Sequence, residues 1–140
     1  MLGTNCVVCW EEGSTRCAVF DPGMSSQDGV NELMEFMAGN GITPDAILLT
    51  HGHFDHVWGV GALLQHFNVP VYMNADDKEI LARGASLFNG MPTFKNLKVD
   101  FPKLIFRKKS PPAASRGRFS EPPAIPLVAY AIIRRKITCS

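Results

Sequence analysis

The chain has 140 residues, of which 46% are hydrophobic and 19% are charged, and its formal net charge is +1. This length allows one small domain with a hydrophobic core, and the composition excludes an intrinsically disordered protein. No apolar run approaches the ~20 residues of a membrane-spanning helix, and no basic segment followed by an apolar one marks a secretory signal. We therefore expect a cytoplasmic protein with no membrane partner.

The four cysteines are expected to be free thiols, because they are too few and too clustered for a disulfide scaffold. Cys6 and Cys9 form a Cys-x-x-Cys motif, which is typical of redox or zinc sites. On a strand, however, positions i and i+3 point to opposite faces of the sheet, so joint chelation of one ion is awkward. We interpret both cysteines as buried strand residues.

Charge and proline content change sharply near residue 100. Residues 1–100 hold 5 basic and 12 acidic residues, whereas residues 101–140 hold 9 basic residues and a single acid, Glu121. Six of the 10 prolines also lie beyond residue 101. We interpret residues 101–140 as a divergent basic, Pro-rich tail that is disordered or represents out-of-frame or fused sequence. The alternative is a genuine basic tail that binds acidic partners.

Nucleic acid is not expected among those partners, because the basic residues of the tail are not interleaved with aromatic residues that could stack on bases.

The first 23 residues predict a β-hairpin. Residues 4–10 are rich in Val, Cys and Trp, residues 11–14 have the composition of a turn, and residues 17–20 form the return strand. The sequence Asp21-Pro22-Gly23 then ends that strand.

An amphipathic helix follows the hairpin. Its apolar residues recur at the i, i+3, i+4, i+7 spacing of one helix face: Val30, Leu33, Met34 and Met37. Ser25 or Ser26 is a suitable N-cap, and Gly39 or Gly41 is a suitable end.

Strands and helices alternate through the rest of the first 100 residues. The elements expected there are a buried strand, a helix, a strand and a helix, at residues 45–50, 57–67, 69–73 and 75–83. This alternation predicts an α/β fold with some parallel strand pairing. In the tail, residues 103–109 are compatible with one basic strand, residues 110–126 are not expected to pack, and residues 127–133 are a short apolar run.

Three histidines and an acid lie together directly after the strand expected at residues 45–50. They are His51, His53, Asp55 and His56, and only one further histidine, His66, occurs in the chain. A loop that leaves a buried strand can turn all four side chains toward one point, and imidazole nitrogen and carboxylate oxygen are suitable ligands for zinc and similar divalent metals. A polar surface loop with chance histidines is the less favoured interpretation.

The pairing within this cluster indicates two metal ions. His51 and His53, two residues apart, are able to chelate one ion, and Asp55 and His56 are able to serve a second ion beside it. Gly52 is expected to let the backbone bend tightly between the ligands.

The run from His51 to His56 resembles the His-x-His-x-Asp-His signature of the metallo-β-lactamase superfamily. The resemblance extends over roughly residues 4–100. Within the superfamily, the sequence is similar to the hydroxyacylglutathione hydrolases (glyoxalase II). It implies the N-terminal half of an αββα sandwich, two face-to-face β-sheets with helices outside. It also implies that His51 and His53 bind the first metal, that Asp55 and His56 bind the second, and that Asp21 supports the site from behind. A plain turn residue is the alternative for Asp21.

Metal-assisted hydrolysis is the mechanism that the resemblance implies. Two divalent ions, zinc or alternatively iron or manganese, lower the pKa of a bound water to give hydroxide near neutral pH, and Asp55 orients that hydroxide. The substrate class implied is a small-molecule thioester or other ester.

The second half of the family's site has no counterpart here. The family adds two histidines and a bridging aspartate from later in the chain, but no histidine follows His66. The sequence therefore predicts a truncated site with two protein ligands per metal. A catalytically inactive remnant that binds metal weakly or not at all is the alternative function.

Overall fold

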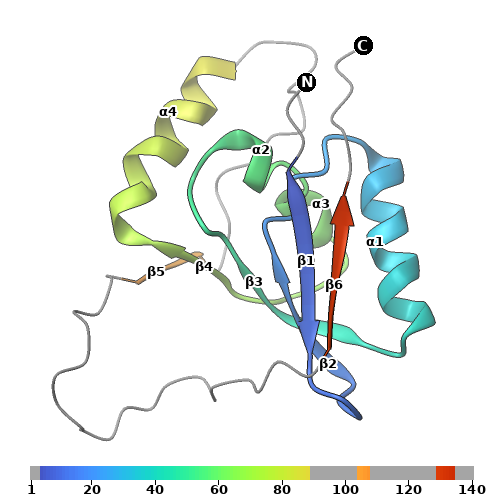
Figure 1. Cartoon of the computed structure of the whole chain (residues 1–140). Helices are drawn as coiled ribbons and strands as arrows, with labels where there is room; N and C mark the ends of the chain where they lie inside the picture. The colour runs from blue at the N-terminus through green and yellow to red at the C-terminus, as the bar shows by residue number, and fades with distance from the viewer. Residues whose placement is uncertain (1–3, 89–103, 108–128, 135–140) are drawn as a thin grey trace, which may run out of the picture.

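The computed structural model describes residues 4–88, 104–107 and 129–134, which form one mixed sheet with helices against it (Figure 1). The sheet has six strands in the order β5-β4-β3-β2-β1-β6. Strand β1 pairs antiparallel with β2 and β6, whereas β2, β3, β4 and β5 pair in parallel. The strands span Asn5–Trp10 (β1), Arg16–Phe20 (β2), Thr43–Leu48 (β3), Val71–Asn74 (β4), Leu104–Arg107 (β5) and Ala129–Arg134 (β6).

The predicted hairpin is confirmed as β1 and β2. Val8 pairs with Val19 across the two strands. The turn between them places Gly13 at a φ of 79°, a left-handed conformation that glycine adopts without steric cost. The amide of Ser14 donates to the carbonyl of Glu11 at 3.0 Å, which closes the turn.

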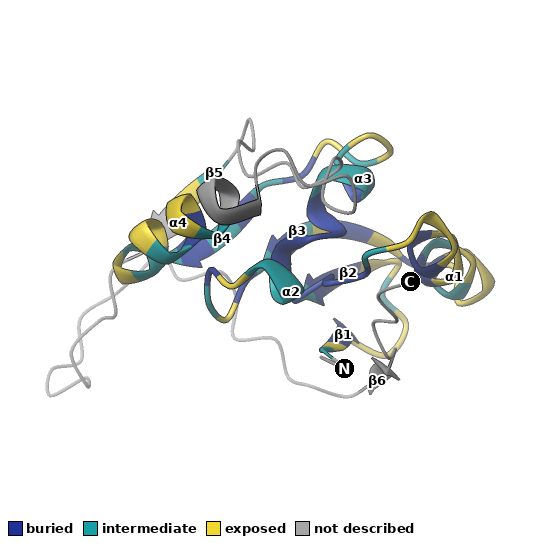
Figure 2. Ribbon diagram, turned by 90° about the horizontal axis from the view of Figure 1, so that it is seen from above, coloured by how far each residue is buried: buried dark blue, intermediate teal, exposed yellow. Residues whose placement is uncertain are grey.

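The amphipathic helix is confirmed as α1, Gln27–Gly39. Its N-cap is Ser26, whose side chain accepts a hydrogen bond from the amide of Gly29. Three of the four predicted face residues, Val30, Leu33 and Met37, are buried, and Met34 is partly buried against the core. Helix α1 thus covers the β1–β2 side of the sheet, with its exposed residues turned outward (Figure 2).

Strand β3 begins two residues earlier than the sequence predicted, because a register shift accommodates Pro44. Cys17 of β2 pairs with Pro44, and the next residue, Ala18, pairs with Ala46, so Asp45 has no partner in the ladder. Such a bulge tolerates a proline, which cannot donate a backbone hydrogen bond. It also turns Asp45 toward Arg16 of β2, with 3.4 Å between Arg16 Nε and Asp45 Oδ2.

The prediction of a single helix over residues 57–67 is wrong. The structure has two short helices, α2 at Phe54–Val57 and α3 at Val60–Leu63, separated by Trp58 and Gly59. The amide of Gly59 donates to the carbonyl of Pro22 at 2.8 Å, so the chain between the helices is bound to the loop after β2. Helical periodicity alone does not reveal this contact.

The last predicted helix is longer than expected. A 3-10 turn, η1 at Ala75–Asp77, leads into α4 at Lys78–Phe88. Helix α4 lies on the β4–β5 side of the sheet (Figures 1 and 2) and buries Leu81 in the core.

Two strands lie within the tail, where we expected regular structure only at residues 103–109. Strand β5 confirms the strand expected there. Strand β6 was not expected, and it pairs with β1 over six residues, from Asn5↔Arg134 to Trp10↔Ala129. The unpaired edge of a strand exposes a row of free backbone amides and carbonyls. The backbone of a second strand of matching length forms hydrogen bonds with them. Residues 108–128 lie outside the described residues, so a boundary at residue 100 and an unpacked segment 110–126 stay predictions.

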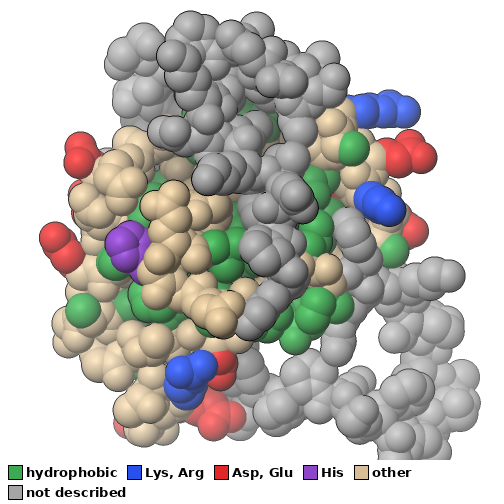
Figure 3. Space-filling model, turned by 180° about the vertical axis from the view of Figure 1, so that it is seen from behind, with side chains coloured by type: hydrophobic (Ala, Val, Ile, Leu, Met, Phe, Trp, Pro, Cys, Tyr) green, Lys and Arg blue, Asp and Glu red, His purple; other side chains and the backbone are tan. Residues whose placement is uncertain are grey.

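The two faces of the sheet are buried to different degrees. Val8, Val19, Ile47 and Val71 occupy one face through successive pairings and are fully buried among the helices. On the opposite face Val7, Phe20 and Leu48 are adjacent in the ladder and only half-buried. In the view from behind, hydrophobic side chains gather at the centre and charged ones lie toward the margins (Figure 3).

The interpretation of Cys6 and Cys9 as buried strand residues is confirmed, since both lie in β1 as buried free thiols. Burial, with a further contribution from the charge of Asp21, raises the pKa of Cys6 to about 12. Within the residues that can be described, no helix is long and apolar enough to cross a bilayer.

Candidate functional site

The histidine loop begins where β3 ends. The amide of Leu49 donates to the carbonyl of Tyr72 at 2.8 Å, which carries the β3–β4 pairing one residue past the strand. Leu49 is buried, and Thr50 and His51 then leave the sheet at its carboxyl edge. In α/β sheets this edge is where ligands bind, because the strands deliver their following loops to it.

The structure brings the three predicted imidazoles together. The ring centroids of His51 and His56 lie 3.8 Å apart, and those of His51 and His53 lie 4.7 Å apart with nearly perpendicular planes. Asp55 joins the group, with 3.8 Å between its Oδ2 and Nε2 of His56. All four predicted site residues therefore form one cluster, although their role as metal ligands stays a prediction.

His66, the fourth histidine, is an exposed residue shortly after the end of α3.

Asp21 lies behind this cluster as a buried carboxylate. It has a φ of 48°, the only positive φ among the described non-glycine residues. Its Oδ1 accepts the amide of Thr50 at 2.8 Å, and its Oδ2 accepts the Thr50 hydroxyl at 2.6 Å. The same Oδ2 lies 3.1 Å from Nδ1 of His56, within ion-pair distance although not aligned as a hydrogen bond. Asp21 thus both ends β2 and contacts the site, so it combines the two roles weighed from the sequence.

Thr4 is a site neighbour that sequence reasoning missed. Its hydroxyl donates to Oδ2 of Asp55 at 2.9 Å, across 51 residues of sequence. No local pattern marks this contact, because it depends on where the start of β1 lies relative to α2. The hydrogen bond restrains the carboxylate that also faces His56.

Gly52 has a different role from the tight bend that the sequence suggested. A Cβ added there would lie 2.8 Å from the carbonyl oxygen of Asp77 and 2.9 Å from the amide of Leu81. Both distances are shorter than side-chain carbons tolerate, so the absence of a side chain lets the histidine loop pack directly on η1 and α4. The glycine serves close approach rather than an unusual φ.

His51 is held in its neutral form more strongly than an isolated histidine. Burial lowers its pKa, and the neighbouring His56 and His53 rings lower it further, because each penalises a positive charge there. Neutral imidazole is the form that offers a lone pair to a metal ion.

The donor atoms match a divalent metal in chemistry, and one pair of them also matches in spacing. Two ligands held about 2.1 Å from one ion at tetrahedral angles stand about 3.4 Å apart, which is close to the 3.8 Å between His56 Nε2 and Asp55 Oδ2. The Nδ1 atom of His56 faces Asp21, so Nε2 is the nitrogen directed to the cluster. Within the described part of the chain, no group of three or more His, Cys, Asp or Glu side chains is arranged to hold a single ion.

Two aromatic residues, Phe54 and Trp58, lie beside the site. Phe54 and Trp58 contact each other edge to face, with centroids 5.9 Å apart. Trp58 is 4% exposed and therefore belongs to the core, whereas Phe54 is partly exposed next to Asp55.

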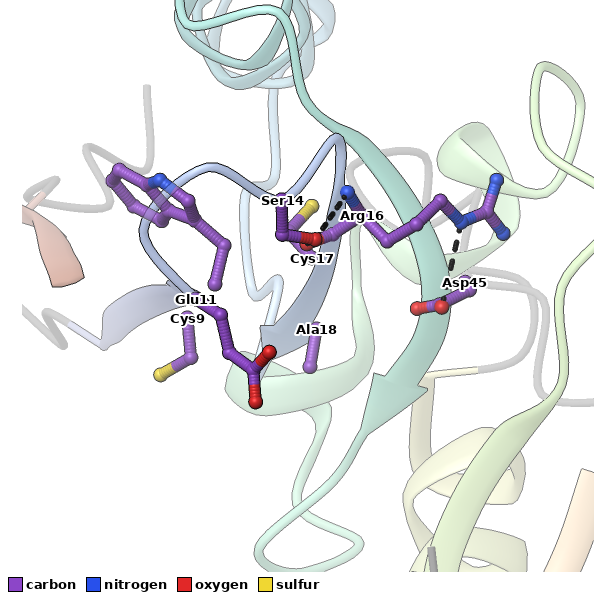
Figure 4. Close-up of a pocket in the computed structure, with 8 residues that line it drawn as sticks. Cys9, Glu11, Ser14, Arg16, Cys17, Ala18 and Asp45 are labelled. Atoms are coloured by element: carbon purple, nitrogen blue, oxygen red, sulfur yellow. Dashed lines mark hydrogen bonds and ion pairs between the residues drawn. The ribbon is translucent and has the colours of Figure 1, made fainter. Parts of the chain in front are cut away.

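A pocket of about 160 Å³ lies at the opposite end of β3, between the hairpin and the start of that strand (Figure 4). Several of its polar lining groups are paired with each other. Arg16 pairs with Asp45, and the amide of Arg16 donates to the hydroxyl of Ser14 at 2.9 Å. The histidine loop, and not this pocket, is therefore the candidate functional site.

Comparison with known proteins decides the family. The model of the metallo-beta-lactamase superfamily matches residues 1–126. The chain belongs to this superfamily. The match covers the histidine loop, and it continues past residue 100 into the segment that the sequence suggested was divergent.

Two curated relatives illustrate the range of the family. A probable metallo-hydrolase of Bacillus subtilis, YqgX, is 36% identical over 76 residues, which is 54% of this chain and 34% of that protein. A hydroxyacylglutathione hydrolase of Pectobacterium carotovorum is 45% identical over 58 residues, which is 41% of this chain and 21% of that protein. The chain spans about a third or less of the length of these curated relatives.

A solved structure supports the fold. The crystal structure of BLEG-1, a B3 metallo-beta-lactamase, is 29% identical and superposes with a TM-score of 0.50, over 65% of this chain and 47% of that one. The expected α/β fold, an incomplete metallo-β-lactamase-like αββα sandwich, is therefore confirmed, and the superfamily resemblance with it.

Proposed function

We propose that the chain is the metal-ligating half of a metal-dependent hydrolase that acts on a small-molecule thioester or other ester. The observation that carries the proposal is the cluster of His51, His53, Asp55 and His56 at the carboxyl edge of the sheet, with Asp21 buried behind it. Superfamily membership supports the hydrolase class. A cytoplasmic location stays a proposal based on sequence alone.

The cluster divides into two pairs of ligands. We infer that His51 and His53 hold the first ion and that Asp55 and His56 hold the second. The 4.7 Å between the ring centroids of His51 and His53 and the 3.8 Å between His56 Nε2 and Asp55 Oδ2 support this pairing. Divalent zinc, iron or manganese supplies Lewis-acid activation of water near neutral pH. Asp55, restrained by Thr4, orients the attacking water, and Asp21 fixes the Thr50–His51 turn and faces His56.

The thioester class rests on the similarity to a hydroxyacylglutathione hydrolase. The chain spans only 21% of that relative, so the substrate class of the relative comes to this chain as a proposal. A catalytically inactive remnant remains the second candidate function. It is favoured because the described residues offer pairs of donors, and no group of three or more that could hold one ion.

Turnover separates the two candidates. We expect negligible hydrolysis of thioesters, lactones and β-lactams by the purified 140-residue chain with added zinc, manganese or iron, because two ligands per ion hold it too loosely. A form extended in the reading frame that restores the family's later histidines should hydrolyse the thioester, and Asp55→Ala should remove most of that rate.

A steady-state assay of the two forms and of each Asp55→Ala variant provides the measurement. An extended form that retains zinc but shows no turnover supports the remnant. Robust metal-dependent hydrolysis by the short chain, lost in Asp55→Ala, contradicts truncation and keeps the hydrolase assignment.

A further inference from the structure

Thr50 connects the buried carboxylate to the first histidine of the cluster. Its hydroxyl oxygen lies 2.6 Å from Oδ2 of Asp21 and 3.0 Å from Nδ1 of His51. The backbone amide of Thr50 is also fixed, since it donates to Oδ1 of Asp21 at 2.8 Å. The hydroxyl is therefore held between two partners, and its single proton can serve only one of them.

The Thr50 hydroxyl donates its proton in the hydrogen bond to Asp21. A carboxylate accepts hydrogen bonds and donates none, so the hydroxyl must donate to it. The distance agrees, because O–H···O⁻ hydrogen bonds measure about 2.5–2.7 Å. Toward His51 the same oxygen has only a lone pair to offer, and Nδ1 of His51 must therefore carry the proton of that hydrogen bond.

We propose that Thr50 is a positioning residue that fixes His51 as the Nδ1–H tautomer and directs its unprotonated Nε2 toward the metal cluster. A histidine ligand needs one nitrogen free of hydrogen, and the hydrogen bond at the other nitrogen determines which one is free. Carboxylate, hydroxyl and imidazole thus form a chain from Asp21 through Thr50 to His51. The tautomer of His51 is a property of the metal-free chain. Its consequence for metal binding rests on the proposed function.

His56 provides an internal control for this chain of contacts. Its Nδ1 faces the same Oδ2 of Asp21 directly, without a hydroxyl between them. Loss of the Thr50 hydroxyl should therefore change the tautomer of His51 and leave that of His56 unchanged. A general loosening of the loop would change both rings together.

The test is nitrogen-detected NMR of the imidazole rings in the metal-free full chain, at a pH where the rings are neutral. In the wild type, Nδ1 of His51 should give the protonated signature and Nε2 the unprotonated one. In Thr50→Val, which keeps the shape of the side chain but removes the hydroxyl, a substantial Nε2–H population should appear. Thr50→Ser, which keeps the hydroxyl, should restore the wild-type signature.

Zinc titration of the same variants measures the consequence. Second partners of metal-binding histidines typically contribute 10–100-fold in affinity, so Thr50→Val should weaken zinc binding about tenfold or more, with Thr50→Ser close to the wild type. A wild-type His51 protonated at Nε2 overturns the proposal without any variant, even if Thr50→Val fails to fold. An unchanged tautomer in folded Thr50→Val also overturns it. A tautomer that switches as expected in a chain that binds no zinc supports the role of Thr50 and contradicts the proposed function instead.

Discussion

Replacing Gly23 with alanine is expected to destabilise the fold by about 3 kcal/mol or more, a loss of roughly 10 °C in Tm. A Cβ at this position would overlap the backbone carbonyl of Asp55 and approach Cα of His56. Both obstacles are main chain, which cannot rotate away as a side chain can. The loop after β2 would have to separate from α2, which carries Asp55 and His56, two of the four proposed metal ligands. Thermal and urea unfolding followed by circular dichroism measure the effect.

Gly39→Ala is the matched control for that substitution. Gly39 ends α1, and a Cβ there meets nothing within 4 Å. Alanine is a better helix former than glycine by up to about 1 kcal/mol, so this variant should be as stable as the wild type or slightly more stable. Equal stability of Gly23→Ala and Gly39→Ala would contradict the close packing of the two loops.

Replacing Asp21 with alanine is expected to cost about 2–4 kcal/mol of folding free energy and to reduce zinc binding. A hydrogen bond to a charged group contributes about 1.5–3 kcal/mol. The buried carboxylate of Asp21 accepts two such bonds, from the amide and the hydroxyl of the exposed Thr50, and both are lost in the variant. Alanine also tolerates the left-handed backbone at this position less well than aspartate. Urea unfolding gives the stability, and zinc titration gives the affinity.

Two variants separate the causes of that loss. Asp21→Asn keeps an acceptor for the Thr50 amide and tolerates a positive φ, so it should be markedly more stable than Asp21→Ala. Asp45→Ala removes a carboxylate whose ion pair with Arg16 is about half exposed, and it should cost at most about 1 kcal/mol. An Asp21→Ala variant no less stable than Asp45→Ala would mean that the buried contacts of Asp21 contribute nothing.

Local patterns were sufficient to predict much of the first 88 residues. The 3.6-residue periodicity of Val30, Leu33 and Met37 identified α1, and the turn composition after Trp10 identified the hairpin. The four candidate site residues could be proposed from the sequence because they lie within six consecutive positions. A site built this way is visible in sequence, since chain connectivity alone keeps its members close.

Contacts between distant segments could not be predicted in this way. The division of one expected helix into α2 and α3 depends on the bond between Gly59 and Pro22, and Thr4 reaches Asp55 only after the sheet has formed. Strand β6 was missed because a short apolar run beside prolines becomes a strand only when an edge such as β1 is available to pair with it. The bulge at Pro44 and Asp45 could not be predicted either, because it arises only when β3 pairs with β2.

Zinc titration of the isotope-labelled chain, followed through the ring signals of its four histidines, tests the metal-binding assignment most directly. We expect the signals of His51, His53 and His56 to shift together on addition of zinc, and His66 not to respond. Loose binding with fast exchange is expected, because the proposed site offers only two protein ligands to each ion. The paired substitution of His51 and His53 by alanine should abolish the response at the first ion. No shift of the clustered rings at millimolar zinc, or a response of His66 equal to theirs, would contradict a metal site in this loop.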